Sequence, residues 1–284
     1  MTALVYIVLC VIWGSTWMAI KLGLADAPPL WAASIRFALA VTILTAIVKV
    51  KGLAYPKGVR DLFWVGHPGL FMYCASYAMV YFAERHINSA MTAVLFASFP
   101  VFVAVLSAYR LKTEQIHGAV WLGLVLSFAG VVLISYDSLQ TSGELFLGSV
   151  LALGASFASA WGLIQHKKYA ATVNIVVAAN VQMFMGGILL VLGALLFENW
   201  SNFAVTSQSV GSIIYLAVFG TVVAFLGYYW LLTHTKAVTV SLIAFITPLV
   251  AILIGVVFGD ETLSTLTLVG AAAILAGVAM VVRK

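Results

Sequence analysis

The feature that constrains this chain most is a stretch that occurs twice. The second copy begins 148 positions after the first, and the offset falls to 147 beyond a shared proline, where one residue has been lost. The matching residues are Tyr81 and Tyr229, His86 and His234, Pro100 and Pro248, Glu114 and Glu261, Gly123 and Gly270, and Gly130 and Gly277. A repeat of about half the 284-residue chain predicts two related halves built from the same elements.

Both halves consist of long apolar runs, which indicate that the solvent around them is lipid. The chain is 64% hydrophobic and 8% charged, whereas soluble domains are about 25% charged. In lipid every backbone polar group must bond within the protein, so only helices and closed barrels cross a membrane. The runs extend over about 20 residues without alternating, which favours helices over barrel strands. We expect an all-α integral membrane protein.

The apolar runs predict ten transmembrane helices, five in each half. The first repeat covers residues 1–136 and the second residues 146–284, and the two form one membrane domain. Each run is about long enough to cross a hydrocarbon core of about 30 Å. The ten spans are 3–24, 29–49, 62–83, 88–109, 115–136, 146–166, 173–197, 210–232, 237–258 and 265–282.

The distribution of Lys and Arg predicts how these spans are oriented. With the N-terminus in the cytoplasm, eleven of the 14 basic residues fall on cytoplasmic links or at the C-terminus, and only Arg85 falls on an external link. Both termini are then cytoplasmic. Because five is an odd number, the two halves must cross the membrane in opposite senses. Such an inverted repeat is typical of secondary transporters that work by alternating access.

Three features, in their order along the chain, resemble the EamA family of the drug/metabolite transporter superfamily. They are the WGSTW motif at 13–17 with its echo FASAW at 157–161, the mid-span prolines Pro100 and Pro248, and the span-opening acids Glu114 and Glu261. Within the family the chain is most similar to bacterial exporters of amino acids, including aromatic ones. The resemblance implies a bacterial inner-membrane protein whose central cavity is lined by spans one, three, four, six, eight and nine.

Aromatic and small polar side chains are the candidates for lining that cavity. Trp13 and Trp17 are four residues apart and share a helix face, as do Tyr77 and Tyr81. An aromatic pocket with few polar groups selects apolar or weakly polar solutes. Ordinary helix packing is the alternative for each residue, and Tyr81 also suits the aromatic belt at the membrane surface. The predicted substrate-binding residues are Trp13, Ser15, Trp17, Tyr77, Tyr81, Phe99, Trp161, Gln165, Tyr228 and Tyr229.

Two basic residues lie inside spans, where a charge is costly and often functional. Lys21 and Arg36 are candidates either for a structural tie or for binding a substrate carboxylate. Lys21 lies near a span end, from where its stem can carry the charge to the headgroups, whereas Arg36 lies about two turns inside span two. The amides of Asn180 and Gln182 are expected to hold helices together, and His166 is expected to be solvated at a span end.

Pro100 and Pro248 are predicted hinges. A proline cannot donate to the carbonyl four residues earlier, so each should interrupt its helix near the middle of the membrane. Broken helices at the interface of two repeats are where transporters bind substrates. A plain packing kink is the alternative, because neighbouring groups can bond the freed carbonyl.

The nine Asp and Glu residues lie at span ends or in links. Carriers driven by protons usually keep an acid at membrane depth, so we expect facilitated diffusion or exchange. Proton-coupled antiport is the alternative, and a channel is a remote alternative because no span carries a polar stripe.

No nucleophile–base pair or metal-ligand spacing occurs within the spans, so we expect no enzyme activity, cofactor or metal.

The expected partners are small-molecule substrates, namely amino acids and metabolites, and the lipid bilayer. No basic stripe with interleaved aromatic residues occurs, which argues against nucleic acid as a partner. Small residues at Ala273 and Gly277 allow close helix approach. That approach would occur either within the chain or across a homodimer, so the sequence leaves monomer and homodimer open.

Overall fold

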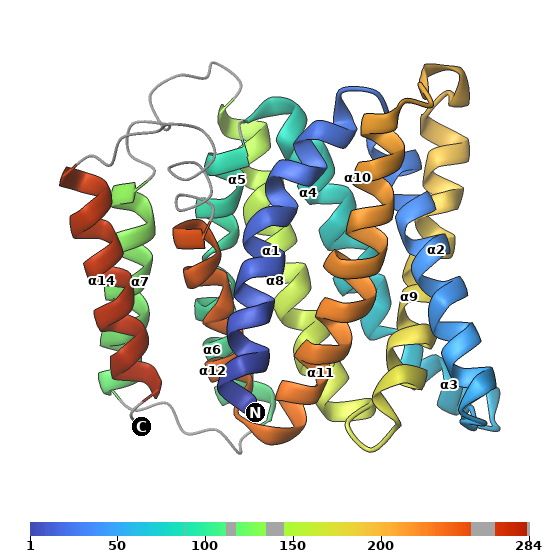
Figure 1. The fold of residues 1–284 in the computed structure, drawn as a ribbon. Coiled ribbons are helices and arrows are strands. Elements are labelled where there is room, and N and C mark those ends of the chain that lie inside the picture. Colours follow the sequence, from blue (N-terminus) through green and yellow to red (C-terminus); the bar gives the residue numbers. More distant parts are fainter. Residues whose placement is uncertain (88, 112–117, 135–144, 251–264, 283–284) are drawn as a thin grey trace.

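The computed structural model describes residues 1–87, 89–111, 118–134, 145–250 and 265–282, which form a bundle of helices running roughly alongside one another (Figure 1). Within these residues, five helical runs are long and apolar enough to span a membrane. They are α1 (Thr2–Leu24), α2 (Pro29–Val50), α8 (Leu145–Tyr169), α9 (Ile175–Phe197) and the run over Ser207–His234. The expected all-helical fold is confirmed over the described residues, and these runs are consistent with a membrane protein, whereas the count of ten spans and their orientation stay predictions.

The other expected spans are shorter or interrupted within the described residues. Span three begins with α3 (Val59–Gly66) and ends with α4 (Ser76–His86), and span four consists of α5 (Ser89–Phe96) and α6 (Phe99–Arg110). Further elements are α7 (Gly118–Ile134), the short η3 (Trp200–Asn202), α12 (Ala237–Ser241) and α14 (Thr265–Val282). We call the end of the bundle at which α1 begins the terminal face, which is the lower edge of Figure 1.

Two π-helical segments occupy matching places in the two halves. In span three, η1 (Leu70–Ala75) precedes α4, and in span eight, η4 (Val218–Val223) joins α10 (Ser207–Ala217) to α11 (Ala224–His234). The two segments lie 148 positions apart, which is the offset of the sequence repeat. A π turn widens the helix by one residue and frequently marks a functional site.

A side chain bonds the backbone carbonyl that Pro100 leaves free. The helix breaks at Ala97 and Ser98, so that Pro100 lies in the first turn of α6. The carbonyl of Phe96 lacks the N–H that a residue other than proline would supply, and the Ser156 hydroxyl of α8 donates to it at 3.2 Å. Since lipid offers no alternative partner, this bond allows the break to lie inside the membrane.

The second predicted hinge differs from the first. Pro248 lies inside a helical stretch over residues 243–250, and the turn in this part of the chain is at Leu242, six residues earlier. The carbonyl of Ala244, which Pro248 frees, accepts a hydrogen bond from the Thr247 hydroxyl at 3.2 Å. The helix break therefore accompanies the proline in the first half but not in the second.

Helices from the two halves pack against one another in matching pairs. α2 packs against α9, and α7 packs against α14. α1 packs against α10 and α11, while α8 packs against η1 and α4. The first two contacts join equivalent spans, namely the second with the seventh and the fifth with the tenth. The other two contacts are equivalent to each other, because the first span packs against the eighth as the sixth packs against the third.

A carboxylate fastens one of these pairs. Both oxygens of Glu198, directly after α9, accept hydrogen bonds of 3.0 Å from the backbone N–H groups of Leu30 and Trp31 in the first turn of α2. These N–H groups lack partners within the helix and carry a partial positive charge. Glu198 therefore has a structural role at the face opposite the terminal face (Figure 1).

The repeated glycines bring α7 and α14 into close contact. A Cβ atom on Gly123 would lie 2.6 Å from the Gly277 oxygen, and one on Gly130 would lie 2.6 Å from the Gly270 oxygen. Between these two crossings the Ser127 hydroxyl donates to the backbone carbonyl of Ile274 at 3.2 Å. The small-residue face of α14 is therefore used for a contact within the chain.

Replacing Gly123 by Ala tests this contact. We expect Gly123→Ala to lower the thermal unfolding midpoint in detergent, because the methyl group would collide with the α14 backbone and overpacking costs about 1–3 kcal/mol. Gly118→Ala is the matched control in the same helix, since nothing lies within 4 Å of its added Cβ. The control should be neutral or stabilising, as Ala is the better helix former. Equal effects of both changes would contradict the contact.

Candidate functional site

A cavity lies between the two halves of the bundle. It provides about 120 Å³ of space for water, several times the about 10–15 Å³ that a single water molecule needs, so it can hold a small solute. Its lining is mostly apolar. The lining residues are Trp13, Thr16, Trp17, Ile20, Arg36, Met72, Ser76, Tyr77, Val80, Phe96, Phe99, Ser159, Phe225, Tyr228, Val240, Ser241, Ile243, Ala244 and Thr247.

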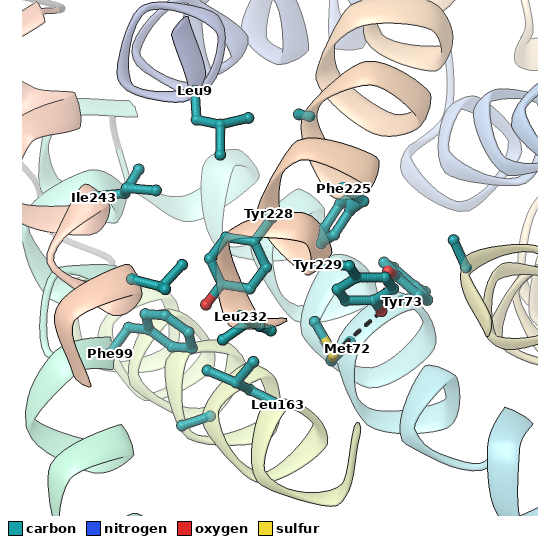
Figure 2. Packing of buried hydrophobic residues seen from close by; sticks show 14 of the residues in the cluster. Leu9, Met72, Tyr73, Phe99, Leu163, Phe225, Tyr228, Tyr229, Leu232 and Ile243 are labelled. Atoms are coloured by element: carbon teal, nitrogen blue, oxygen red, sulfur yellow. Dashed lines mark hydrogen bonds between the residues drawn. The ribbon is translucent and has the colours of Figure 1, made fainter. Parts of the chain in front are cut away.

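Aromatic rings form much of the wall. The Trp13 ring lies 5.4 Å from the Phe225 ring and 5.1 Å from the Tyr228 ring, measured between centroids. Trp17 lies 5.8 Å from Phe96 in an edge-to-face arrangement. Tilted and edge contacts at these distances are favourable and fix the ring positions. Figure 2 shows Phe225 and Tyr228 with the buried side chains around them.

The hydroxyl of Tyr228 is a polar group of this wall that has no hydrogen-bond partner in the described part of the structure. The side chain is 2% exposed and lines the cavity, and Figure 2 shows the hydroxyl directed toward Phe99. An unpaired buried hydroxyl costs free energy. The arrangement therefore favours a bound molecule that supplies the partner.

Arg36 brings a positive charge to the cavity. It is 1% exposed, and its Nε donates to the Thr221 hydroxyl at 2.7 Å. Its terminal nitrogens donate to Tyr81 at 3.4 Å, to Tyr77 at 3.4 Å and to the Gly220 carbonyl at 3.2 Å. These four partners are neutral, and a guanidinium has five N–H donors. Among the described hydrogen bonds, one N–H donor of the guanidinium is left without an acceptor, and it suits an anionic group.

A second polar group of side chains, which we call the Gln182 cluster, lies beside the cavity. The hydroxyls of Tyr73 and Tyr229 are 2.6 Å apart, and Tyr229 donates to Oε1 of Gln182. Nε2 of Gln182 lies 2.9 Å from the carbonyl of Val65 and 3.0 Å from Nδ1 of His166. The His166 ring is stacked on Tyr229 at 3.8 Å between centroids. Figure 2 shows Tyr229 beside Tyr73 and Met72.

The structure brings six of the residues predicted from the sequence to one cavity, where their role in binding stays a prediction. They are Trp13, Trp17, Arg36, Tyr77, Phe99 and Tyr228. Tyr81 lies behind Arg36 and is 1% exposed, so it is buried rather than part of a membrane-surface belt. Tyr229 belongs to the Gln182 cluster.

Four other predicted residues lie away from the lining. The Ser15 hydroxyl lies 2.6 Å from the hydroxyl of Tyr215 and holds α1 to α10. Trp161 stacks against Arg110, whose guanidinium carbon lies 4.7 Å from the centre of the Trp161 ring. Gln165 is half-buried on α8 outside the lining. Lys21 is exposed in the last turn of α1, where its charge is compatible with the headgroup position.

The interpretation of His166 as a solvated residue is wrong. Its side chain is 4% exposed because Tyr229 covers one face of the ring and Gln182 bonds its nitrogen. The two amides do hold helices together, as expected. Asn180 links α9 to Val41 and Thr45 of α2 and accepts from Tyr55, and Gln182 links α9 to α3, α8 and α11.

Several lining residues were not identified from the sequence. The repeat offset contains a signal for two of them, because Phe225 lies 148 positions after Tyr77 and Ser159 lies 144 positions after Ser15. The Ser159 hydroxyl donates to that of Ser76 at 2.7 Å across the cavity wall. Among the described residues, no group of three His, Cys, Asp or Glu is placed to hold a metal ion.

Comparison of the sequence with known proteins finds one matching family and several related transporters. The EamA-like transporter family matches residues 1–136 and again residues 146–283. The uncharacterized inner membrane transporter YedA of Escherichia coli is 28% identical over 90% of this chain and 82% of its own length. An uncharacterized transporter of Archaeoglobus fulgidus is 29% identical over 96% of this chain and 95% of its own length. Protein PagO of Salmonella typhimurium is 26% identical over 88% of this chain and 82% of its own length.

A protein of known crystal structure has the same fold. It superimposes with a TM-score of 0.80 over 99% of this chain and 97% of its own, at 18% identity. At 18% sequence identity this similarity shows that the fold is shared and nothing about function.

Removing the amide of Gln182 tests whether the Gln182 cluster holds the helices together. Gln182→Leu leaves the Val65 carbonyl, the His166 nitrogen and the Tyr229 hydroxyl without their shared partner, and each such loss costs about 1–3 kcal/mol. We expect a clearly lower thermal unfolding midpoint in detergent. The control is Gln208→Leu, because Gln208 is exposed and makes one bond, to the Leu22 carbonyl at 2.9 Å. A loss no larger than that of the control would contradict the role.

Proposed function

This chain belongs to the EamA-like transporter family, and we propose that it exports amino acids and related small metabolites from the cytoplasm by alternating access. As a family member similar to YedA, it is a multi-pass transporter of the inner membrane. The observation that carries the proposed substrate class is the buried guanidinium of Arg36, which lines an aromatic cavity and whose four described hydrogen-bond partners are neutral.

The chemistry of the cavity matches the three parts of an amino acid. The guanidinium of Arg36 suits the carboxylate, because charge-assisted bonds to carboxylates are among the strongest that a side chain makes. The faces of Trp13 and Tyr228 suit the ammonium group through cation–π attraction, and the free Tyr228 hydroxyl suits a polar group of the solute. The remaining aromatic walls suit an apolar side chain.

The contact between α7 and α14 supports the proposal of an inverted repeat. Ser127 and Ile274 are 147 positions apart, so they hold the same place in the two halves, and they bond to each other. Gly123 contacts Gly277, and Gly130 contacts Gly270. Because Gly123 corresponds to Gly270 in the repeat and Gly130 corresponds to Gly277, exchanging the two halves turns one contact into the other. Two copies related by a local two-fold axis make contacts of this kind.

The same symmetry supports alternating access. The matching helix pairs and the π segments η1 and η4 give the two faces of the bundle similar elements. A movement of one half can open the cavity between the two halves to one face of the bundle. The equivalent movement of the other half then opens the cavity to the opposite face. Apart from Arg36 of α2, in span two, the lining residues come from the six spans that the family resemblance implies.

Efflux from proteoliposomes tests the substrate class. We expect Arg36→Gln to slow efflux of phenylalanine at least tenfold, because a bond to a charged group contributes about 1.5–3 kcal/mol and about 1.4 kcal/mol is tenfold. Phenethylamine, which lacks the carboxylate, should move poorly through the parent protein and be unaffected by the change. Lys21→Gln is the control and should leave phenylalanine efflux intact. Equal efflux of the two solutes by the parent would contradict the role of Arg36.

Cysteine labelling tests the inverted repeat. Lys51 follows the second span of the first half and Ser201 follows the second span of the other, and both are exposed. In a variant without Cys10 and Cys74, a membrane-impermeant maleimide should label Ser201→Cys in intact cells, and Lys51→Cys only after permeabilisation. Labelling of both positions from the same side would refute opposite orientations.

A further inference from the structure

We propose that His166 is a proton-binding site that controls opening of the bundle at the terminal face, with protonation releasing the Gln182 cluster. The inference rests on the proposed function, because it names the ion that regulates the proposed transport. The Gln182 cluster joins four spans that begin or end at this face, namely spans three, six, seven and eight. Tyr73 comes from η1, Tyr229 from α11, Gln182 from α9 and His166 from α8.

The hydrogen bonds of the Gln182 cluster have a single direction. Nδ1 of His166 lies 3.0 Å from Nε2 of Gln182 and 3.3 Å from its Oε1, so the closer contact makes Nδ1 an acceptor. The two hydrogens of Nε2 then serve His166 and the Val65 carbonyl. Oε1 accepts from Tyr229, whose hydroxyl must in turn accept from Tyr73. Each donor in these four contacts has an acceptor as long as Nδ1 of the imidazole carries no proton.

A proton on Nδ1 disrupts this arrangement, because the acceptor within its reach is Oε1 of Gln182 at 3.3 Å, which already accepts from Tyr229. Both nitrogens of an imidazolium are donors, so Nδ1–H would face a hydrogen on Nε2 of Gln182. Turning the amide over would place its NH₂ against Tyr229 and remove the bond to Val65. The charge would also be buried among neutral groups, which is costly until water reaches it. Protonation therefore favours a conformation in which His166 leaves the Gln182 cluster and contacts water at the terminal face.

No carboxylate lies within the Gln182 cluster to stabilise that charge in place. The ionisable side chains on His166's own helix and on the elements nearest to it at this end of the bundle are Lys167, Lys168, Tyr169, Arg60, Asp61, His67, Tyr73, Cys74, Tyr228, Tyr229, His234, Tyr109 and Arg110. Asp61 is exposed at the start of α3, and Lys167 and Arg110 are cations that oppose a second positive charge. The surroundings described here therefore favour separation over retention of the protonated ring.

The Gln182 cluster is coupled to the cavity and has a counterpart in the first half. The Tyr229 hydroxyl lies 3.9 Å from the sulfur of Met72, which lines the cavity. Gln182 is the eighth residue of α9, and Arg36 is the eighth residue of α2. Each bonds the tyrosine of the repeated pair in its own half, Arg36 to Tyr81 and Gln182 to Tyr229. The first half has a permanent charge at this place, whereas the second has a neutral amide beside a titratable ring.

A distance measurement across the terminal face tests the inference without any substrate. Spin labels on Lys168→Cys and Thr233→Cys, both exposed, report the separation of α8 and α11 in a variant without Cys10 and Cys74. We expect one distance population at pH 8 and a second, longer one at pH 5. In His166→Gln, which bonds but does not titrate, the pH 5 and pH 8 distributions should coincide. A parent distribution independent of pH, or a pH response that persists in His166→Gln, would overturn the inference.

Amino acid efflux at equal pH on both sides of the liposome gives the second readout. The parent should change its efflux at least threefold between pH 8 and pH 5, His166→Gln should lose this dependence, and His234→Asn should keep it. His234 is the matched control because it is an exposed histidine at the same face. A dependence lost in His234→Asn and kept in His166→Gln would also overturn the inference. If no amino acid is transported at any pH, the proposed function fails, while the spin-label distances still decide the role of His166.

Discussion

The structure depends on the constraint that polar groups inside a membrane must find partners within the protein. Ser156 and Thr247 bond the carbonyls that Pro100 and Pro248 leave free, so helix breaks and kinks become possible at membrane depth. Gln182 satisfies groups from three other elements. Of the seven buried side-chain atoms in the described residues that lack a hydrogen-bond partner, the hydroxyl of Tyr228 lines the cavity. The guanidinium of Arg36 lines it as well.

The repeated halves give the same elements two different chemical roles. η1 and η4 are equivalent in sequence position, and each lies beside the polar residue at the eighth place of a neighbouring helix. Thr221 of η4 accepts from Arg36, and Tyr73 of η1 bonds the tyrosine that donates to Gln182. The two related halves thus place different groups at equivalent positions. Near one face of the bundle the group is the permanent cation of Arg36, and near the other it is the amide of Gln182 hydrogen-bonded to the imidazole of His166. This difference allows the two ends to respond to different signals.

The sequence predicted what depends on periodicity and spacing. The apolar runs, the repeat offset and the glycines of α7 and α14 all concern helices whose contacts follow from their own residues. The sequence failed where a residue's surroundings come from distant parts of the chain. His166 lies three residues from the end of α8, yet Tyr229, more than sixty residues later, covers its ring. Trp161 matches Trp17 in the repeat, but Arg110 and Phe71 hold it away from the cavity.

The central claim is that one cavity is exposed alternately at two faces by related movements of two related halves. Paired distances test it most directly. Spin labels at the exposed positions Lys168 and Thr233 report on the terminal face, and labels at the exposed positions Ala25 and Arg85, at the corresponding helix ends of the first half, report on the opposite face. On addition of a transported amino acid, the account predicts that one distance increases as the other decreases. Distances that stay constant, or that change together in the same direction, would contradict it.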